Sequence, residues 1–189
     1  DLYDVRAGVL AAKENTKLPV WVTMTYETTG RTFTGTKIES MAVTLEGLGV
    51  DAIGFNCSLG PKEILPLAKK LKEWTNLPII IKPNAGLPNP STGEYDLLAT
   101  DFAKLMAEFG EIGIEYAGGC CGTSPEFISE LKAEFENRNF SEIKPAKAKT
   151  GICSGNEMVE LNGVRVVGER LNPTGKKRFQ AVSYTHLTL

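Results

Sequence analysis

Residues 118–125 read Gly-Gly-Cys-Cys-Gly-Thr-Ser-Pro and mark a point where a strand ends and a helix begins. Successive side chains of a strand point to opposite faces, so neighbouring cysteines can reach one atom only where the strand breaks into a turn. The glycines permit that turn. A serine or threonine before Pro125 can cap the helix, whose first position suits proline. The stretch therefore predicts two thiols, Cys120 and Cys121, beside a helix N-terminus, whose partial positive charge favours thiolates.

Upstream of this turn, strand-like and helix-like segments alternate at a spacing of about 30 residues, which is typical of βαβ units and a parallel sheet. Continuous apolar runs such as Ile79-Ile80-Ile81 fit a sheet covered on both faces. The expected strands cover residues 18–26, 50–56, 77–83 and 113–117, and the expected helices cover residues 1–14, 37–48, 96–109 and 125–137, with a further helix that Pro61 opens.

Two α/β architectures fit this order, a doubly wound open sheet and a (β/α)8 barrel. Polar candidates stand where the strands end, at Glu27, Cys57, Asn84, Cys120 and Cys121. A barrel collects its active site from separate loops at that end of its strands, which favours the barrel. Four units are half of such a barrel, so we expect a C-terminal half whose other strands lie upstream.

The composition changes after residue 138. Residues 139–157 are polar and rich in lysine, glycine and serine, as interdomain linkers are. Beyond them, residues 158–161 and 164–167 flank an Asn-Gly pair, which predicts a β-hairpin. We therefore expect residues 158–181 to begin a second, truncated domain.

Charge and hydropathy exclude several classes of partner. A net charge of −2 over 189 residues supplies no basic surface for nucleic acid. No apolar run approaches the ~18 residues of a membrane span, and the first residues carry no export signal, so we expect a cytoplasmic protein. Four cysteines, two of them adjacent, do not resemble a disulfide framework and indicate a metal site or catalysis.

The thiols of Cys57, Cys120 and Cys121 suit zinc, because three protein ligands leave the fourth tetrahedral position open for a substrate. The single histidine, His186, lies in the C-terminal tail. Buried free cysteines are the alternative. A redox pair is disfavoured because adjacent cysteines close a strained ring. An open position among thiolates suits a thiol substrate, which predicts alkyl transfer to sulfur.

Three stretches resemble signature sequences of the homocysteine-binding domain of zinc-dependent homocysteine S-methyltransferases. They are Gly-Phe-Asn-Cys at 54–57, Lys-Pro-Asn-Ala-Gly at 82–86, and residues 118–125. The resemblance covers residues 1–138. It implies that this part is the C-terminal half of a homocysteine-binding barrel and that homocysteine is the substrate.

The same resemblance implies site residues. Zinc would be bound by Cys57, Cys120 and Cys121. No catalytic residue beyond these three ligands is implied. Asn84 matches an asparagine that offers its oxygen to zinc when substrate is absent, whereas an asparagine after proline also suits a plain turn. Glu27 is a candidate for lining the substrate pocket, with an exposed loop carboxylate as the alternative.

Residues 168–177 resemble the opening of the pterin-binding domain of the cobalamin-dependent methionine synthase branch, with Asn172 as a pterin contact. A simple turn at 172–175 is the alternative. The resemblance implies methyl transfer from methylcobalamin, held on another domain, and its regeneration by methyltetrahydrofolate. The alternatives are a betaine- or S-methylmethionine-dependent enzyme and a non-catalytic domain whose structural zinc has a fourth protein ligand.

Two departures from the family are expected to matter. The first four barrel strands are missing, together with the acidic group that would hold the substrate ammonium, so we expect the isolated fragment to be inactive. Residues 182–189 alternate like a strand where the family continues into a helix, so we interpret them as a foreign tail.

Overall fold

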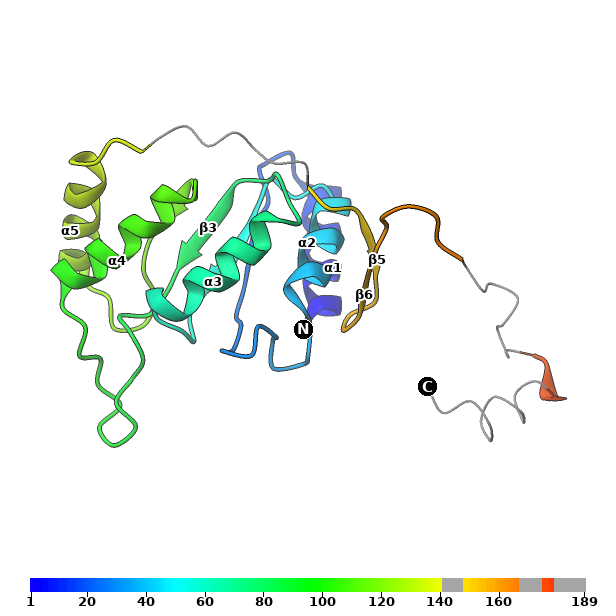
Figure 1. The fold of residues 1–189 in the computed structure, drawn as a ribbon, viewed down its shortest axis with the longest axis horizontal. Helices are drawn as coiled ribbons and strands as arrows, with labels where there is room; N and C mark the ends of the chain where they lie inside the picture. Colours follow the sequence, from blue (N-terminus) through cyan, green and yellow to red (C-terminus); the bar gives the residue numbers. More distant parts are fainter. Residues whose placement is uncertain (141–147, 167–174, 179–189) are drawn as a thin grey trace.

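The computed structural model describes residues 1–140, 148–166 and 175–178. Strands and helices alternate through the first of these parts, as expected (Figure 1). The elements are α1 (Leu2–Asn15), β1 (Trp21–Met24), α2 (Ile38–Gly47), β2 (Ala52–Asn56), α3 (Pro61–Lys72), β3 (Ile79–Lys82), α4 (Ala99–Glu111), β4 (Tyr116–Ala117), α5 (Pro125–Glu136), β5 (Gly151–Cys153) and β6 (Met158–Glu160).

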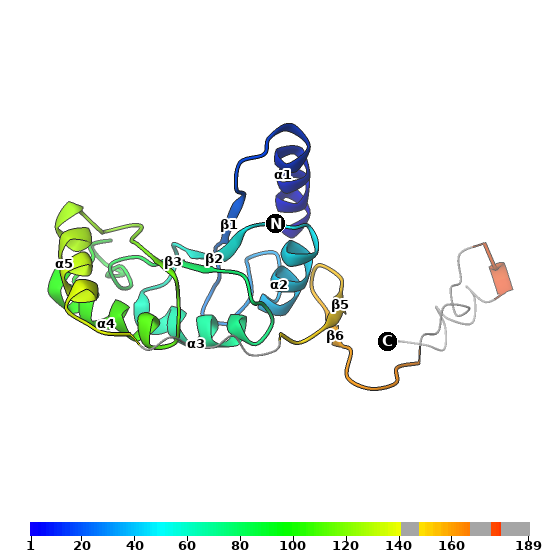
Figure 2. The same cartoon turned by 90° about the horizontal axis from the view of Figure 1, so that it is seen from above.

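The first four strands form one parallel sheet in the order β1-β2-β3-β4. Figure 2 shows α2, α3 and α4 along one side of this sheet. A doubly wound sheet reverses its strand order and carries helices on both faces. Consecutive order with the connecting helices on one side is instead the local arrangement of a (β/α)8 barrel.

The core lies between the sheet and these helices. Alternate strand residues point toward the helices and are buried because apolar side chains of α2, α3 and α4 cover them. The largest fully buried side chains here include Ile53, Phe55, Ile79 and Ile81 from the strands and Met41, Leu45, Leu71 and Phe102 from the helices.

The opposite face of the sheet is less covered. Thr23, Gly54, Ile80 and Tyr116 share one register line across the four strands. Tyr116 is 40% exposed, and its ring centroid lies 4.6 Å from that of Trp21, which is 52% exposed. Two large aromatic rings on this face leave substantial apolar area in contact with solvent.

The prediction of a hairpin that turns at residues 162–163 is wrong. The strand β6 pairs antiparallel with β5, so that Ile152 lies opposite Val159. Residues 164–166 form no strand, and Val164 is 98% exposed. An isolated hairpin is marginal in water, whereas pairing with β5 brings Met158 against the core.

Residues 148–157, which the composition assigns to a linker, pack against the sheet domain. The Cys153 thiol lies 3.3 Å from the Thr44 hydroxyl of α2. Lys149 pairs with Glu73 at 2.6 Å and lies over the ring of Trp74. Figure 1 shows β5 and β6 beside α2. These described residues are therefore a docked hairpin.

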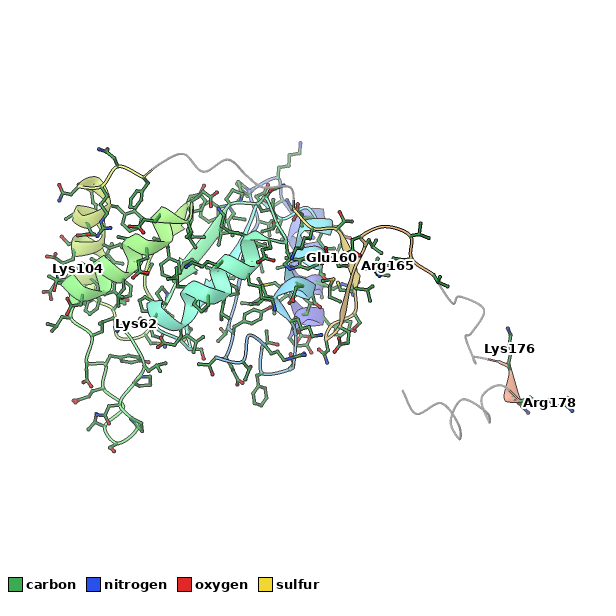
Figure 3. All side chains as sticks on the ribbon, in the orientation of Figure 1. Lys62, Lys104, Glu160, Arg165, Lys176 and Arg178 are labelled. Carbon is green, nitrogen blue, oxygen red and sulfur yellow. The ribbon has the colours of Figure 1, made fainter. Side chains whose placement is uncertain are left out.

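The chain leaves this hairpin through a short segment that includes the exposed Val164 and Val166. The Arg165 guanidinium Nε donates to the Glu160 carbonyl oxygen at 3.2 Å, and both side chains are seen at the hairpin in Figure 3. Asn172 and the expected foreign tail at 182–189, which includes His186, lie outside the described residues. The domain boundaries therefore stay a prediction. Within the described ranges, no helix has the length and apolar character to cross a bilayer.

A substitution at Gly54 tests how closely β2 and β3 approach each other. A Cβ atom at Gly54 would lie 1.8 Å from the Ile80 carbonyl oxygen, so Gly54→Ala must push the two backbones apart. We expect a loss of about 1–3 kcal/mol in unfolding free energy, measured by urea denaturation followed by circular dichroism.

The matched control is Gly8→Ala in α1, where a Cβ would meet no atom within 4 Å. Alanine favours the helix by about 0.5–1 kcal/mol over glycine, so this variant is expected to gain stability. Equal stability of Gly54→Ala and the parent protein would contradict the described strand approach.

Candidate metal centre

Three cysteine sulfurs meet at the C-terminal edge of the parallel sheet. Cys57 directly follows β2, and Cys120 and Cys121 follow β4. Their sulfurs all lie within 4.8 Å of one another, and the Cys57 and Cys121 sulfurs are 3.5 Å apart. The expected convergence of these thiols is thus present in the structure.

An unusual backbone conformation places Cys57. Its φ is 61° and that of Ser58 is 62°, both in the left-handed region. Such residues cost about 1–3 kcal/mol each and persist where the surroundings hold them. The Cys57 N–H donates to the Lys82 carbonyl at 3.0 Å, and the Leu59 N–H donates to the Cys57 carbonyl at 2.7 Å. These bonds turn the chain abruptly after β2.

Backbone hydrogen bonds attach the double-cysteine turn to the loop after β3. The Cys120 N–H donates to the Pro83 carbonyl at 2.8 Å, and the Ala85 N–H donates to the Cys121 carbonyl at 2.9 Å. Ser124 occupies the N-cap position of α5 without a side-chain capping bond. The Thr123 hydroxyl donates instead to the Cys120 carbonyl at 2.7 Å, which tightens the turn.

Asn84 lies between the two cysteine loops and is only 3% exposed. Its Oδ1 accepts from the Cys121 N–H at 3.1 Å, and its Nδ2 donates to the Tyr95 hydroxyl at 3.5 Å. The residue therefore stands beside the thiols as the sequence indicates. Its oxygen is engaged by the Cys121 backbone, and its role as a ligand stays a prediction.

The remaining candidates lie apart from the thiols or outside the described residues. Glu27 is exposed in a turn closed by its backbone bonds to Gly30 and Arg31. In the described ranges, the metal-capable group holds the three cysteines and no carboxylate. Substrate contact by Glu27 and pterin contact by Asn172 stay predictions.

Tyr95 is a site residue that the sequence analysis missed. It belongs to the loop between β3 and α4, and Asn84 Nδ2 donates to its hydroxyl at 3.5 Å. Burial and the nearby Cys121 and Cys57 thiolate charges raise the pKa of the Tyr95 phenol. A lone tyrosine in a loop of Gly, Pro, Asn and Ser offers no sequence pattern by which to find it.

The thiols do not ionise independently. Partial burial acts to raise the pKa of Cys57, but hydrogen bonds from the Ser58 backbone, the other two thiols and Asn84 outweigh burial and lower this pKa. The pKa of Cys121 is raised by its hydrogen bond to Cys57 and by the charge of neighbouring sulfurs. The two thiols therefore titrate as a coupled pair, with the lower pKa on the Cys57 side.

The donor set fits zinc. Zinc–sulfur bonds of about 2.3 Å in a tetrahedron place sulfurs about 3.8 Å apart, close to the 3.5 Å between Cys57 and Cys121 and within the 4.8 Å that spans the three. Cys57 and Cys120 are half-buried, and Cys121 is exposed. A metal held by the three sulfurs would therefore face solvent on one side.

The profile of the homocysteine S-methyltransferase family matches residues 1–135. The chain belongs to this family. Methionine synthases of Mycobacterium tuberculosis and Mycobacterium leprae are 34% and 32% identical to it over 190 and 195 residues. Each alignment covers 95% of the chain and 16% of the relative, so the chain spans about a sixth of the length of these curated relatives.

The family fold is also found among solved structures. The homocysteine methyltransferase MmuM from Escherichia coli, in its metallated form, superposes with a TM-score of 0.58 at 23% identity, covering 70% of this chain and 41% of MmuM. The apo form of MmuM superposes with a TM-score of 0.57 at 22% identity, covering 71% of this chain and 46% of MmuM. These likenesses establish a shared α/β fold with a parallel sheet.

The order of thiol ionisation can be measured by alkylation, because the thiolate is the nucleophile. In metal-free protein, a lowered pKa makes the Cys57 thiolate available at lower pH than that of Cys121. Over about pH 6 to 9, which brackets an ordinary thiol, iodoacetamide should therefore modify Cys57 first, as read by peptide mass spectrometry.

Urea-unfolded protein is the control, in which the two rates should converge. Since Cys121 is the more exposed thiol, accessibility alone predicts the reverse order. Earlier modification of Cys121 in the folded protein would contradict the described hydrogen bonding.

Proposed function

We propose that the chain carries the zinc-thiolate site of a homocysteine S-methyltransferase, with Cys57, Cys120 and Cys121 as ligands. One observation carries this proposal. Cys57 is 63 residues from Cys120 in the sequence, yet the three sulfurs lie within 4.8 Å of one another. Family membership supports homocysteine as the thiol substrate.

The sheet is proposed to be the C-terminal half of a (β/α)8 barrel. Its strands follow chain order, and its connecting helices lie on one side. The other face bears the exposed Trp21–Tyr116 pair, where a barrel would have its packed interior. The match to 41% of metallated MmuM supports the same assignment.

The chain's own groups are suited to hold charge at this site. Three thiolates around one divalent ion carry one net negative charge. Against the effect of burial, polar groups around Cys57, the Ser58 backbone first among them, lower the pKa of its thiol, and α5 begins four residues after Cys121. Zinc held here supplies a Lewis-acidic position at which a substrate thiol loses its proton and stays nucleophilic.

The proposed methyl donor is methylcobalamin, carried by another domain of the same polypeptide, as in cobalamin-dependent methionine synthase. Support comes from the methionine synthase relatives, whose alignments cover 95% of the chain whereas the family profile ends at residue 135. A second domain from about residue 158, with Asn172 at the pterin, would bind methyltetrahydrofolate. Betaine or S-methylmethionine as donor is the alternative within the family.

A structural zinc site is the alternative outside enzyme function. Such a site needs a fourth protein ligand to close the tetrahedron. The described residues bring together three potential ligands, and Cys121 is exposed, which favours an open position.

Zinc X-ray absorption separates the open site from the closed one. In the complete zinc-loaded enzyme, homocysteine should replace a nitrogen or oxygen neighbour of zinc with sulfur and release a proton. The expected spectrum changes from three sulfur neighbours to four. An unchanged spectrum at saturating homocysteine would support the structural alternative.

Cys120→Ser tests the ligand assignment. This variant of the complete enzyme should lose zinc and methyl transfer while keeping folate binding, because the second domain is separate from the thiols. Cys153→Ser is the matched control and should retain zinc, since Cys153 contacts Thr44 of α2. Loss of folate binding in Cys120→Ser would indicate a general folding defect.

A further inference from the structure

Tyr95 stands at the base of a short hairpin-like loop between β3 and α4. Pro88 and Tyr95 form an antiparallel bridge. The Asn89 N–H donates to the Glu94 carbonyl at 2.7 Å, and the Gly93 N–H donates to the Asn89 carbonyl at 2.8 Å. Figure 1 shows this loop projecting from the sheet domain before α4. The bridge thus fixes where the Tyr95 side chain starts.

The Tyr95 ring packs directly on the backbone that follows Cys121. Gly122 has a φ of +78°, and a Cβ at this position would lie 2.5 Å from Cγ of Tyr95. A side chain at residue 122 would displace the ring. Because residue 122 is glycine, the Tyr95 ring can lie against the double-cysteine turn.

The Tyr95 hydroxyl lies beside the cysteine cluster. Asn84 Nδ2 donates to the phenol oxygen at 3.5 Å, so the phenol proton is available for another acceptor. Burial and the charge of the nearby Cys121 sulfur raise the pKa of this phenol, so this sulfur is an acceptor close to the hydroxyl. The Cys121 N–H donates to Asn84 Oδ1 at 3.1 Å, so Asn84 links the double-cysteine turn to the Tyr95 hydroxyl.

We propose that Tyr95 is a positioning residue of the metal centre, which donates a hydrogen bond to the Cys121 thiolate while its ring packs on the adjacent Gly122. The inference rests on the proposed function and deepens it. Three thiolates around one ion repel one another, and each hydrogen bond to a sulfur offsets part of this repulsion. The bond also holds the Cys121 side chain toward Cys57.

The phenol and its ring have separable effects. Tyr95→Phe keeps the ring on Gly122 and removes only the hydroxyl. Loss of a hydrogen-bonding partner of a metal ligand typically lowers metal affinity by about 10- to 100-fold. Because Tyr95 is half-buried, we expect the lower end, about tenfold weaker zinc binding by chelator competition.

Cobalt(II) substitution supplies a readout that ring packing alone does not move. A hydrogen bond stabilises the sulfur lone pairs, so its loss in Tyr95→Phe should shift the thiolate-to-cobalt absorption to longer wavelength. The matched control is Tyr3→Phe on α1, a tyrosine whose ring lies beside Arg6 and near Gly155. It should match the parent protein in spectrum and zinc affinity.

Three results would overturn the inference. Parental spectrum and affinity in Tyr95→Phe would show that the hydroxyl does nothing at the metal. Weaker zinc binding without a spectral shift would show that it acts other than through the Cys121 sulfur. Absence of thiolate-to-cobalt absorption in the parent protein would instead remove the proposed metal site itself, which distinguishes failure of the function from failure of the role of Tyr95.

Discussion

Backbone hydrogen bonding between the loops after β3 and β4 is the constraint on which the site depends. Parallel strands bring their carboxyl ends to one edge, but that alone sets thiols only roughly near one another. The bonds from Cys120 to Pro83 and from Ala85 to Cys121 hold one loop against the other. The hydrogen bond from the Cys57 N–H to the Lys82 carbonyl holds the third thiol beside these two loops.

The site combines groups that oppose one another electrostatically. Adjacent sulfurs disfavour multiple ionisation, as the raised pKa of Cys121 indicates. A divalent ion reverses this effect because it stabilises every thiolate it touches. The buried amide of Asn84 is hydrogen-bonded both to the Cys121 N–H and to the Tyr95 hydroxyl. Hydrogen bonds among the protein's own residues thus hold the double-cysteine turn beside Asn84 and Tyr95.

Family membership and the docked hairpin give this chain a wider context. The α/β core corresponds to less than half of MmuM and the whole chain to a sixth of the mycobacterial methionine synthases. Residues 149–160 are held on α2 and α3 by Lys149, Cys153 and Glu157. Whatever follows residue 160 thus leaves from a surface attached to the sheet domain.

The sequence by itself determined the order of strands and helices and the three thiols, because hydrophobic periodicity and the Gly-Gly-Cys-Cys-Gly turn are local signals. Only the tertiary structure decided the left-handed backbone at Cys57, the place of Tyr95 and the partner of β6. The Asn-Gly pair is a strong local turn signal, yet burial of Met158 and contact with α2 outweighed it. Contacts between distant segments set these features, and no short stretch encodes them.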